Sequence, residues 1–155
     1  MGEAACAALA GCARVADLFC GVGAFTFRLA RTAQVRAADV SAPAIAALTH
    51  AIGSAPGLKA ITAEARDLAR RPLLAAEMKG LDGLVFDPPR AGALEQAREI
   101  AASKVGLAVG VSCNPATFAR DARILADAGF LLTHVQPIDQ FLWSPHVELV
   151  GVFRR

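Results

Sequence analysis

The stretch DLFCGVGAFT, residues 17–26, follows a short apolar run, Val15–Leu18, and leads into a segment with helical periodicity. Gly21 and Gly23 let the backbone turn tightly and approach a ligand closely. A dinucleotide-binding fingerprint has a third glycine three residues further on, and Thr26 stands at that position, which argues against NAD. The stretch therefore predicts a strand, a ligand-binding turn and a crossover helix, which together begin an α/β fold.

Apolar, strand-like runs alternate with helical patterns along the chain. The expected strands are Val15–Leu18, Val35–Val40, Leu58–Ala63, Gly83–Asp87, Val105–Ser112, Leu131–Pro137 and Val147–Phe153. The expected helices are one that ends near Gly11 and, between the first six strands, Ala24–Arg31, Ala42–Ile52, Ala65–Met78, Leu94–Ser103 and Ala116–Ala128. This alternation predicts a Rossmann-like α/β fold with a mostly parallel seven-stranded sheet and helices on both faces. Since no helix separates the last two strands, one strand is expected to run antiparallel to the rest.

Composition narrows the class of protein. The chain has 155 residues, of which 55% are hydrophobic, and a formal net charge of +2. No apolar run is long enough to span a membrane and the start lacks the basic segment of a secretory signal, so a cytoplasmic protein without a membrane partner is expected. The four cysteines form no C-x-x-C pair, which predicts neither a metal site nor a disulfide framework. The basic residues are scattered, so binding of nucleic acid by charge alone is expected to be weak.

Acidic residues at strand ends indicate the cofactor. Asp17 lies directly ahead of the glycine turn, where a carboxylate suits a ligand that carries an ammonium group. Asp39 ends the second strand, where it can accept hydrogen bonds from ribose hydroxyls; alternatively it caps the next helix, a role that Ser41 can fill instead. Two glycines and two strand-end carboxylates together favour S-adenosylmethionine. After the third strand, Glu64 is preferred to Asp67 as the partner of the adenine amino group because it lies closer to the strand end, although either can be a first-turn helix charge.

Three further positions carry reactive side chains. The loop DPPRAG, residues 87–92, follows the fourth strand, and its two prolines stiffen it so that Asp87 can be held toward cofactor or substrate. Cys113 lies between the fifth strand and a helix N-terminus, which is the position of a nucleophile over a pocket; a buried apolar cysteine is the alternative. Glu148 lies within the apolar last strand, where a carboxylate costs free energy unless it is partnered. It is the candidate general base, and a solvent-facing edge position is the alternative.

Four motifs stand in order along the chain: DLFCGVGAF, DPPRAG, SCNPATFARD and HVELV. Together they resemble the catalytic domain of the RNA uracil-C5 methyltransferases, the family that makes 5-methyluridine in ribosomal and transfer RNA. The resemblance covers about Val15 to Phe153 and implies a class I S-adenosylmethionine-dependent methyltransferase fold. Residues 1–155 would then be a single catalytic domain, either a fragment or a naturally split enzyme, without the N-terminal RNA-binding and central domains of that family.

The resemblance implies a role for each site residue. Cys113 would attack C6 of the uracil ring, which makes C5 nucleophilic toward the methyl donor, and Glu148 would remove the C5 proton. Asp87 would lie near both the cofactor and the target base. RNA is the implied partner, and a target base within folded RNA would have to be flipped out of its stack. The expected cofactor-binding residues are Asp17, Phe19, Gly21, Gly23, Asp39, Glu64 and Asp87.

Three other functions are weighed against this one. A cytosine-C5 methyltransferase has a Pro-Cys pair after the fourth strand, whereas DPPR at residues 87–90 contains no cysteine. An adenine-N6 methyltransferase has an aromatic residue at the fourth position of that loop, where Arg90 stands. From another class, a module that binds the cofactor but is inactive without missing RNA-binding parts or a partner is the remaining alternative.

Overall fold

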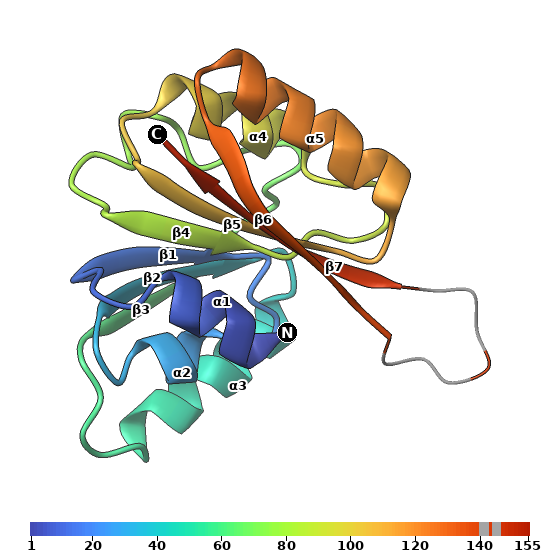
Figure 1. Ribbon diagram of the computed structural model, residues 1–155. Helices are drawn as coiled ribbons and strands as arrows, with labels where there is room; N and C mark the ends of the chain where they lie inside the picture. The colour runs from blue at the N-terminus through green and yellow to red at the C-terminus, as the bar shows by residue number, and fades with distance from the viewer. Residues whose placement is uncertain (140–142, 144–146) are drawn as a thin grey trace.

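The computed structural model describes residues 1–139, 143 and 147–155. In this part of the chain seven strands form one sheet: β1 Arg14–Leu18, β2 Gln34–Asp39, β3 Ile61–Ala65, β4 Gly83–Phe86, β5 Leu107–Ser112, β6 Leu131–Ile138 and β7 Glu148–Arg154. Their order across the sheet is β3-β2-β1-β4-β5-β7-β6 (Figure 1). β7 is antiparallel to both of its neighbours, and the other adjacent pairs are parallel. The predicted sheet is confirmed, with its reversed strand second from one edge.

Helices cover both faces of the sheet, as predicted. They are α1 Gly2–Ala8, α2 Thr26–Leu29, α3 Ala42–Gly53, α4 Leu94–Ala102 and α5 Pro115–Asp127. α4 and α5 lie on one face, and α1, α2 and α3 lie on the other (Figure 1). Because successive side chains of a strand point to opposite faces, each face has its own core. In β1, Ala16 and Leu18 pack in the core beneath α4 and α5, whereas Val15 packs in the core with α1 and α2.

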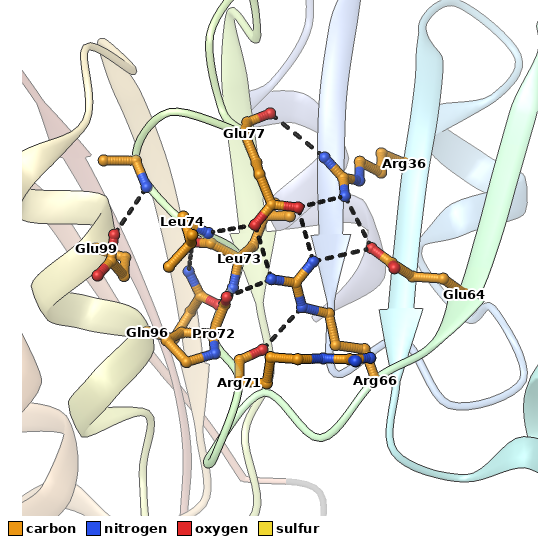
Figure 2. Close-up of polar contacts among 11 residues, drawn as sticks. Arg36, Glu64, Arg66, Arg71, Pro72, Leu73, Leu74, Glu77, Gln96 and Glu99 are labelled. Atoms are coloured by element: carbon orange, nitrogen blue, oxygen red, sulfur yellow. Dashed lines mark hydrogen bonds and ion pairs between the residues drawn. The ribbon is translucent and has the colours of Figure 1, made fainter.

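The connection between β3 and β4 differs from the predicted helix Ala65–Met78. Residues 66–82 form turns joined by irregular segments instead. Arg66 is buried, and its guanidinium donates to the backbone carbonyls of Arg71 and Pro72 at 2.8 and 2.5 Å (Figure 2). Side chains that bind backbone groups compete with helical hydrogen bonds, and a proline has no N–H to contribute to them. The helix prediction is therefore wrong for this segment.

Glu77 and Gln96 attach this segment to the rest of the fold. The Glu77 carboxylate accepts hydrogen bonds from Arg66 at 2.8 and 2.7 Å and from Arg36 of β2 at 3.0 Å (Figure 2). The hydrogen bond from Arg66 is the main cause that lowers the pKa of Glu77 to about 2. Gln96 of α4 accepts the N–H of Leu73 at 2.8 Å and donates to its carbonyl at 3.0 Å. The connection is thus held by side chains rather than by a regular element.

The other predicted elements overlap the observed ones, with shifted ends. β3 lies further along the chain than the predicted Leu58–Ala63, and α2 is shorter than the predicted Ala24–Arg31. Of the motif HVELV, His146 lies outside the described residues. None of the helices in the described ranges combines the length and the apolar character that crossing a membrane requires.

Candidate active site

The carboxyl edge of the parallel strands collects most of the predicted site residues. Asp39 ends β2, Asp87 directly follows β4 and Cys113 directly follows β5. β7 runs in the opposite direction, so its first residue, Glu148, lies at the same edge. Neighbouring strands are about 4.8 Å apart, so these positions form a row that also includes the turn at residues 19–23 after β1. Open α/β sheets bind their ligands along this edge.

The turn after β1 is tight and closely packed. Phe19, Gly21 and Gly23 have φ angles of 63°, 54° and 95°, and a left-handed backbone costs free energy for a residue such as phenylalanine. A Cβ atom on Gly23 would lie 2.7 Å from Cδ1 of Leu48 in α3. Packing and backbone angle therefore both require glycine at residue 23. Strained backbone of this kind clusters at ligand sites.

Asp39 holds the glycine turn to β2. Its Oδ2 accepts the N–H of Gly21 at 2.9 Å, and its Oδ1 accepts the N–H of Ser41 at 2.8 Å. The side-chain cap of α3 is Ser41, whose hydroxyl accepts the N–H of Ala44 at 3.3 Å. Of the two roles considered for Asp39, helix capping thus belongs to Ser41. The half-buried Asp39 carboxylate retains further lone pairs for a ligand.

Asp17 is a fully buried carboxylate beneath this turn. Its Oδ2 accepts the hydroxyl of Thr26 at 2.5 Å, whereas its Oδ1 has no hydrogen-bond partner within residues 1–139, 143 and 147–155. Burial raises the pKa of Asp17 to about 7, and the charges of Asp87 and Asp39 act in the same direction. A buried oxygen without a donor costs free energy. A ligand that brings a cationic donor to this oxygen would remove that cost.

Asp87 and Glu148 form a second acidic pair further along the edge. The N–H of Asp87 donates to the Leu18 carbonyl at 3.1 Å, which ties the start of the DPPRAG loop to β1. Burial, and after it the nearby Glu148 carboxylate, raise the pKa of Asp87 to about 6. Glu148 itself is buried, with 6% of its surface exposed, so it does not occupy the solvent-facing position considered as the alternative.

Cys113 is half-buried between a structured turn and a helix start. The Ser112 hydroxyl accepts the N–H of Asn114 at 3.1 Å, and the Asn114 side chain caps α5 by accepting the N–H of Ala116 at 3.1 Å. The four cysteines are free, and the described part of the chain holds no group of three or more His, Cys, Asp or Glu side chains suited to a metal ion. Its exposure distinguishes Cys113 from the buried Cys20, whose pKa burial raises to about 12.

The two candidates for the adenine contact have different surroundings. Glu64 pairs with Arg36 at 2.9 Å and lies 3.5 Å from Arg66, within the network that holds the β3–β4 connection (Figure 2). Asp67 lies in a turn, where its Oδ1 accepts the N–H of Ala69 at 3.1 Å. A cavity of about 230 Å³ opens beside this turn, lined by Phe19, Leu68, Ala69, residues 91–95 and Arg120. The contact of Glu64 with adenine stays a prediction.

Comparison with known proteins identifies the family. The family model for tRNA (uracil-5-)-methyltransferase matches residues 3–155. The chain belongs to this family. The family suggested by the four motifs is therefore confirmed, together with the methyltransferase fold.

Relatives of this uracil-5 methyltransferase family chain are longer proteins. An RNA methyltransferase of Caulobacter vibrioides is 66% identical over 155 residues, which are all of this chain and 37% of that protein. The 23S rRNA (uracil(1939)-C(5))-methyltransferase RlmD of Xanthomonas euvesicatoria is 38% identical over 144 residues, 92% of this chain and 32% of that one. The structure of Pyrococcus abyssi tRNA (uracil-54, C5)-methyltransferase with S-adenosyl-L-homocysteine has a TM-score of 0.82 and 30% identity, and the match covers 98% of this chain and 36% of that one. The chain thus spans about a third of the length of these relatives.

Sequence reasoning missed several residues that shape the site of this family member. Thr26 was considered only as the absent third glycine, yet its hydroxyl binds Asp17. The signal was present, because a hydroxyl one helical turn beyond a glycine turn can reach the strand before it. The side chains of Asn114, Arg120 and Asp121 were part of the quoted motif SCNPATFARD, but their contacts with the DPPRAG loop could not be foreseen from their spacing alone.

Proposed function

We propose that this chain is the catalytic domain of an RNA methyltransferase that transfers a methyl group from S-adenosylmethionine to C5 of a uridine. The observation that carries the proposal is the convergence, on one sheet edge, of an acid-lined glycine turn, Cys113 and the buried Glu148. Membership of the uracil-5 methyltransferase family supports the same reaction. Relatives named for 23S rRNA and for tRNA indicate the two classes of substrate RNA.

The residues of the edge suit each part of S-adenosylmethionine. The unpartnered Oδ1 of buried Asp17 fits the ammonium group, and the remaining lone pairs of Asp39 fit the ribose hydroxyls. No heavy atom lies within 4 Å of the position of a Cβ on Gly21, which leaves room for the methionine part to approach the backbone, whereas Gly23 lets the turn pack against Leu48. When bound, the cofactor supplies an electrophilic methyl group.

The adenine ring fits the cavity beside Phe19. We assign the contact with its amino group to Asp67 rather than to Glu64, because Asp67 adjoins the cavity-lining Leu68 whereas Glu64 is neutralised by Arg36. Asp87 lies between the glycine turn and Glu148 along the edge, which suits contact with both the cofactor and the target base. A carboxyl with a pKa of about 6 can hold or release a proton near neutral pH.

The chain's own residues account for the covalent chemistry. The Cys113 thiolate forms a bond to C6 of the uracil ring, and the electron pair of the C5–C6 double bond makes C5 a nucleophile. After C5 has gained the methyl group, the Glu148 carboxylate takes the C5 proton. The electron pair of that C–H bond re-forms the double bond and expels the Cys113 thiolate. The enzyme returns to its starting state once Glu148 has released this proton to water.

RNA is the proposed macromolecular partner, and this chain alone is expected to bind it weakly. The relatives carry about twice as many further residues as this chain has. Those residues are the expected source of most RNA affinity. The cytoplasmic location predicted from the sequence is compatible with an RNA substrate and remains a prediction.

A transcript in which 5-fluorouridine replaces uridine tests the reaction. Fluorine at C5 leaves no proton for Glu148 to remove, so the bond between Cys113 and C6 persists and RNA stays attached to the protein after denaturation. We expect this complex with a tRNA or a 23S rRNA transcript in the presence of S-adenosylmethionine, its loss in Cys113→Ala, and its retention in Cys6→Ala. A complex that survives Cys113→Ala would contradict the assignment. Cofactor binding by calorimetry without any complex on either transcript would favour the cofactor-binding module instead.

A further inference from the structure

We propose that one face of α5 positions the DPPRAG loop, so that Asp87 and Cys113 move as one rigid unit. This α5 clasp consists of Asn114, Thr117, Arg120 and Asp121. Its role in catalysis rests on the proposed function, whereas its contacts with the DPPRAG loop do not depend on that function. Residues three or four apart share one side of a helix, which explains how one face reaches the loop at several points.

Two backbone carbonyls of the loop are bound by the clasp. Asn114 Nδ2 donates to the Arg90 carbonyl at 3.1 Å, and the Thr117 hydroxyl lies 3.2 Å from the same oxygen. Arg120 donates from Nη2 to the Ala91 carbonyl at 3.1 Å. Three side chains from two turns of α5 thus hold two consecutive peptide groups of the loop.

Asp121 fixes the end of the loop from inside the protein. This residue is 3% exposed, its Oδ2 accepts the N–H of Ala93 at 2.6 Å, and its Oδ1 accepts Nε of Arg120 at 2.9 Å. Gly92 lies so close to the clasp that an added Cβ would be 2.5 Å from Arg120 Nη2 and 2.8 Å from Asp121 Oδ2. With φ of +78°, Gly92 is also in the left-handed region. The loop and α5 therefore fit together without room for a side chain at residue 92.

The clasp connects the DPPRAG loop with the turn that follows β5, and each of these two segments carries a proposed reactive group. Cys113 directly precedes Asn114, the first residue of the clasp, and Asp87 begins the loop that the clasp holds. The stiff prolines at residues 88 and 89 transmit the position of the held peptides to Asp87. A shift of about 1 Å in a reacting group can cost roughly 100-fold in rate. We therefore assign Arg120 and Asp121 as positioning residues.

α5 also offers a matched control. Arg123 and Asp127 form an equivalent ion pair at 2.8 Å, but both side chains are largely exposed to solvent. Removing them takes the same charges from the same helix without touching the DPPRAG loop. The test compares Arg120→Ala and Asp121→Ala with Arg123→Ala and Asp127→Ala in the full chain, with Arg120→Lys and Asp121→Asn as conservative variants.

Three quantities separate an effect on positioning from an effect on stability. They are the amide hydrogen exchange of Gly92 and Ala93, the rate of complex formation with a saturating 5-fluorouridine transcript of tRNA or 23S rRNA, and the dissociation constant of S-adenosylmethionine. With S-adenosylmethionine saturating for each variant, we expect Arg120→Ala to raise the exchange and to slow complex formation at least about tenfold. The dissociation constant of each variant sets that saturating concentration, because Arg120 also lines the proposed adenine cavity. The control variants should match wild type in all three, and the conservative variants should recover part of the rate. Because Arg120 is partly exposed, Arg120→Ala is expected to fold. This variant therefore tests the clasp even where Asp121→Ala does not fold.

Two results would overturn the clasp: unchanged exchange at Gly92 and Ala93 in Arg120→Ala, or raised exchange with an unchanged rate of complex formation. A wild-type chain that forms no complex would refute the proposed reaction, and the exchange data would then decide the coupling between α5 and the loop by themselves.

Discussion

Cys113 and Glu148 stand one residue beyond the same rung of the β5–β7 ladder. Ser112 pairs with Leu149 at the end of that antiparallel ladder, so the next residue of one strand and the preceding residue of the other reach the same end. Directly opposed residues of antiparallel strands are about 5 Å apart. The thiol and the carboxylate are 35 positions apart in sequence, and the ladder thus brings them close together at the edge of the sheet.

The first prediction separates the role of Cys113 from the role of Glu148. Glu148→Gln should leave bond formation by Cys113 intact but prevent removal of the C5 proton, so a covalent complex should accumulate on ordinary uridine RNA. Turnover should fall by about 10²- to 10⁴-fold, the usual contribution of a general base. Denaturing electrophoresis followed by mass spectrometry detects the covalent complex, and the amount of methylated RNA formed per unit time gives the turnover. Glu3→Gln, an exposed change on α1, should behave as wild type. Wild-type turnover by Glu148→Gln would exclude Glu148 as the base.

The second prediction follows from the burial of Asp17. Its pKa is about 7 in the folded chain and about 3.9 when unfolded, so the folded state retains a proton that the unfolded state has lost. The free energy of unfolding without cofactor should therefore fall as pH rises from about 4 to about 7. Asparagine has nearly the shape of a protonated aspartic acid and carries no charge. The free energy of unfolding of Asp17→Asn should therefore exceed that of wild type by about 2–4 kcal/mol at pH 8, and the two values should be nearly equal at pH 4.

Urea unfolding at pH 4 and pH 8 measures this difference, and calorimetry measures its counterpart in binding. The affinity of wild type for S-adenosylmethionine should rise between pH 6 and pH 8, because the ionised Asp17 receives the ammonium group. Asp17→Asn should lose both the affinity and its pH dependence. Asp127→Asn serves as the control for a change of charge alone. Equal stabilities of wild type and Asp17→Asn at pH 8 would argue against an ionised Asp17.

The third prediction separates Glu64 from Asp67. If Asp67 binds the adenine amino group, Asp67→Asn should weaken cofactor binding roughly 10- to 100-fold, the loss of a hydrogen bond to a charged group. Glu64→Gln should leave the dissociation constant within about twofold and should instead lower the free energy of unfolding slightly, because Arg36 loses one of its two carboxylate partners and keeps Glu77. Calorimetry and urea unfolding on both variants give the two quantities. If instead Glu64→Gln weakens cofactor binding and Asp67→Asn does not, the adenine contact belongs to Glu64, as predicted from the sequence.

The succession of strands and helices along the chain and the row of site residues could be predicted because they depend on local patterns. Asp39, Asp87 and Cys113 stand at or directly after the ends of three of the apolar runs, and parallel strands bring their ends to one edge, which is why these residues lie together. The β3–β4 connection could not be predicted in this way. Its conformation depends on Arg66, whose partner Glu77 lies eleven positions away, and on Gln96 from another element. The helical periodicity of residues 66–82 does not reveal these contacts.

The last prediction tests that network through acid unfolding. The pKa of Glu77 is lowered from 4.5 to about 2, chiefly by the hydrogen bond from Arg66, so the folded state favours the ionised carboxylate. The resulting stability is complete above about pH 4.5 and is lost as pH falls toward 2. Glu77→Gln should be less stable than wild type by about 2–3 kcal/mol at pH 7, because the buried Arg66 loses its anionic partner.

The difference between Glu77→Gln and wild type should narrow steadily between pH 4.5 and pH 2.5 in urea unfolding. Glu95→Gln is the matched control, since the pair of Glu95 with Arg98 has a similar length of 2.8 Å but is exposed. Exposed pairs contribute about 0–1 kcal/mol, so this variant should stay close to wild type at every pH. A difference for Glu77→Gln that does not change with pH would mean that its carboxylate acts through shape alone, because only an ionised group with a lowered pKa links stability to protons in this range.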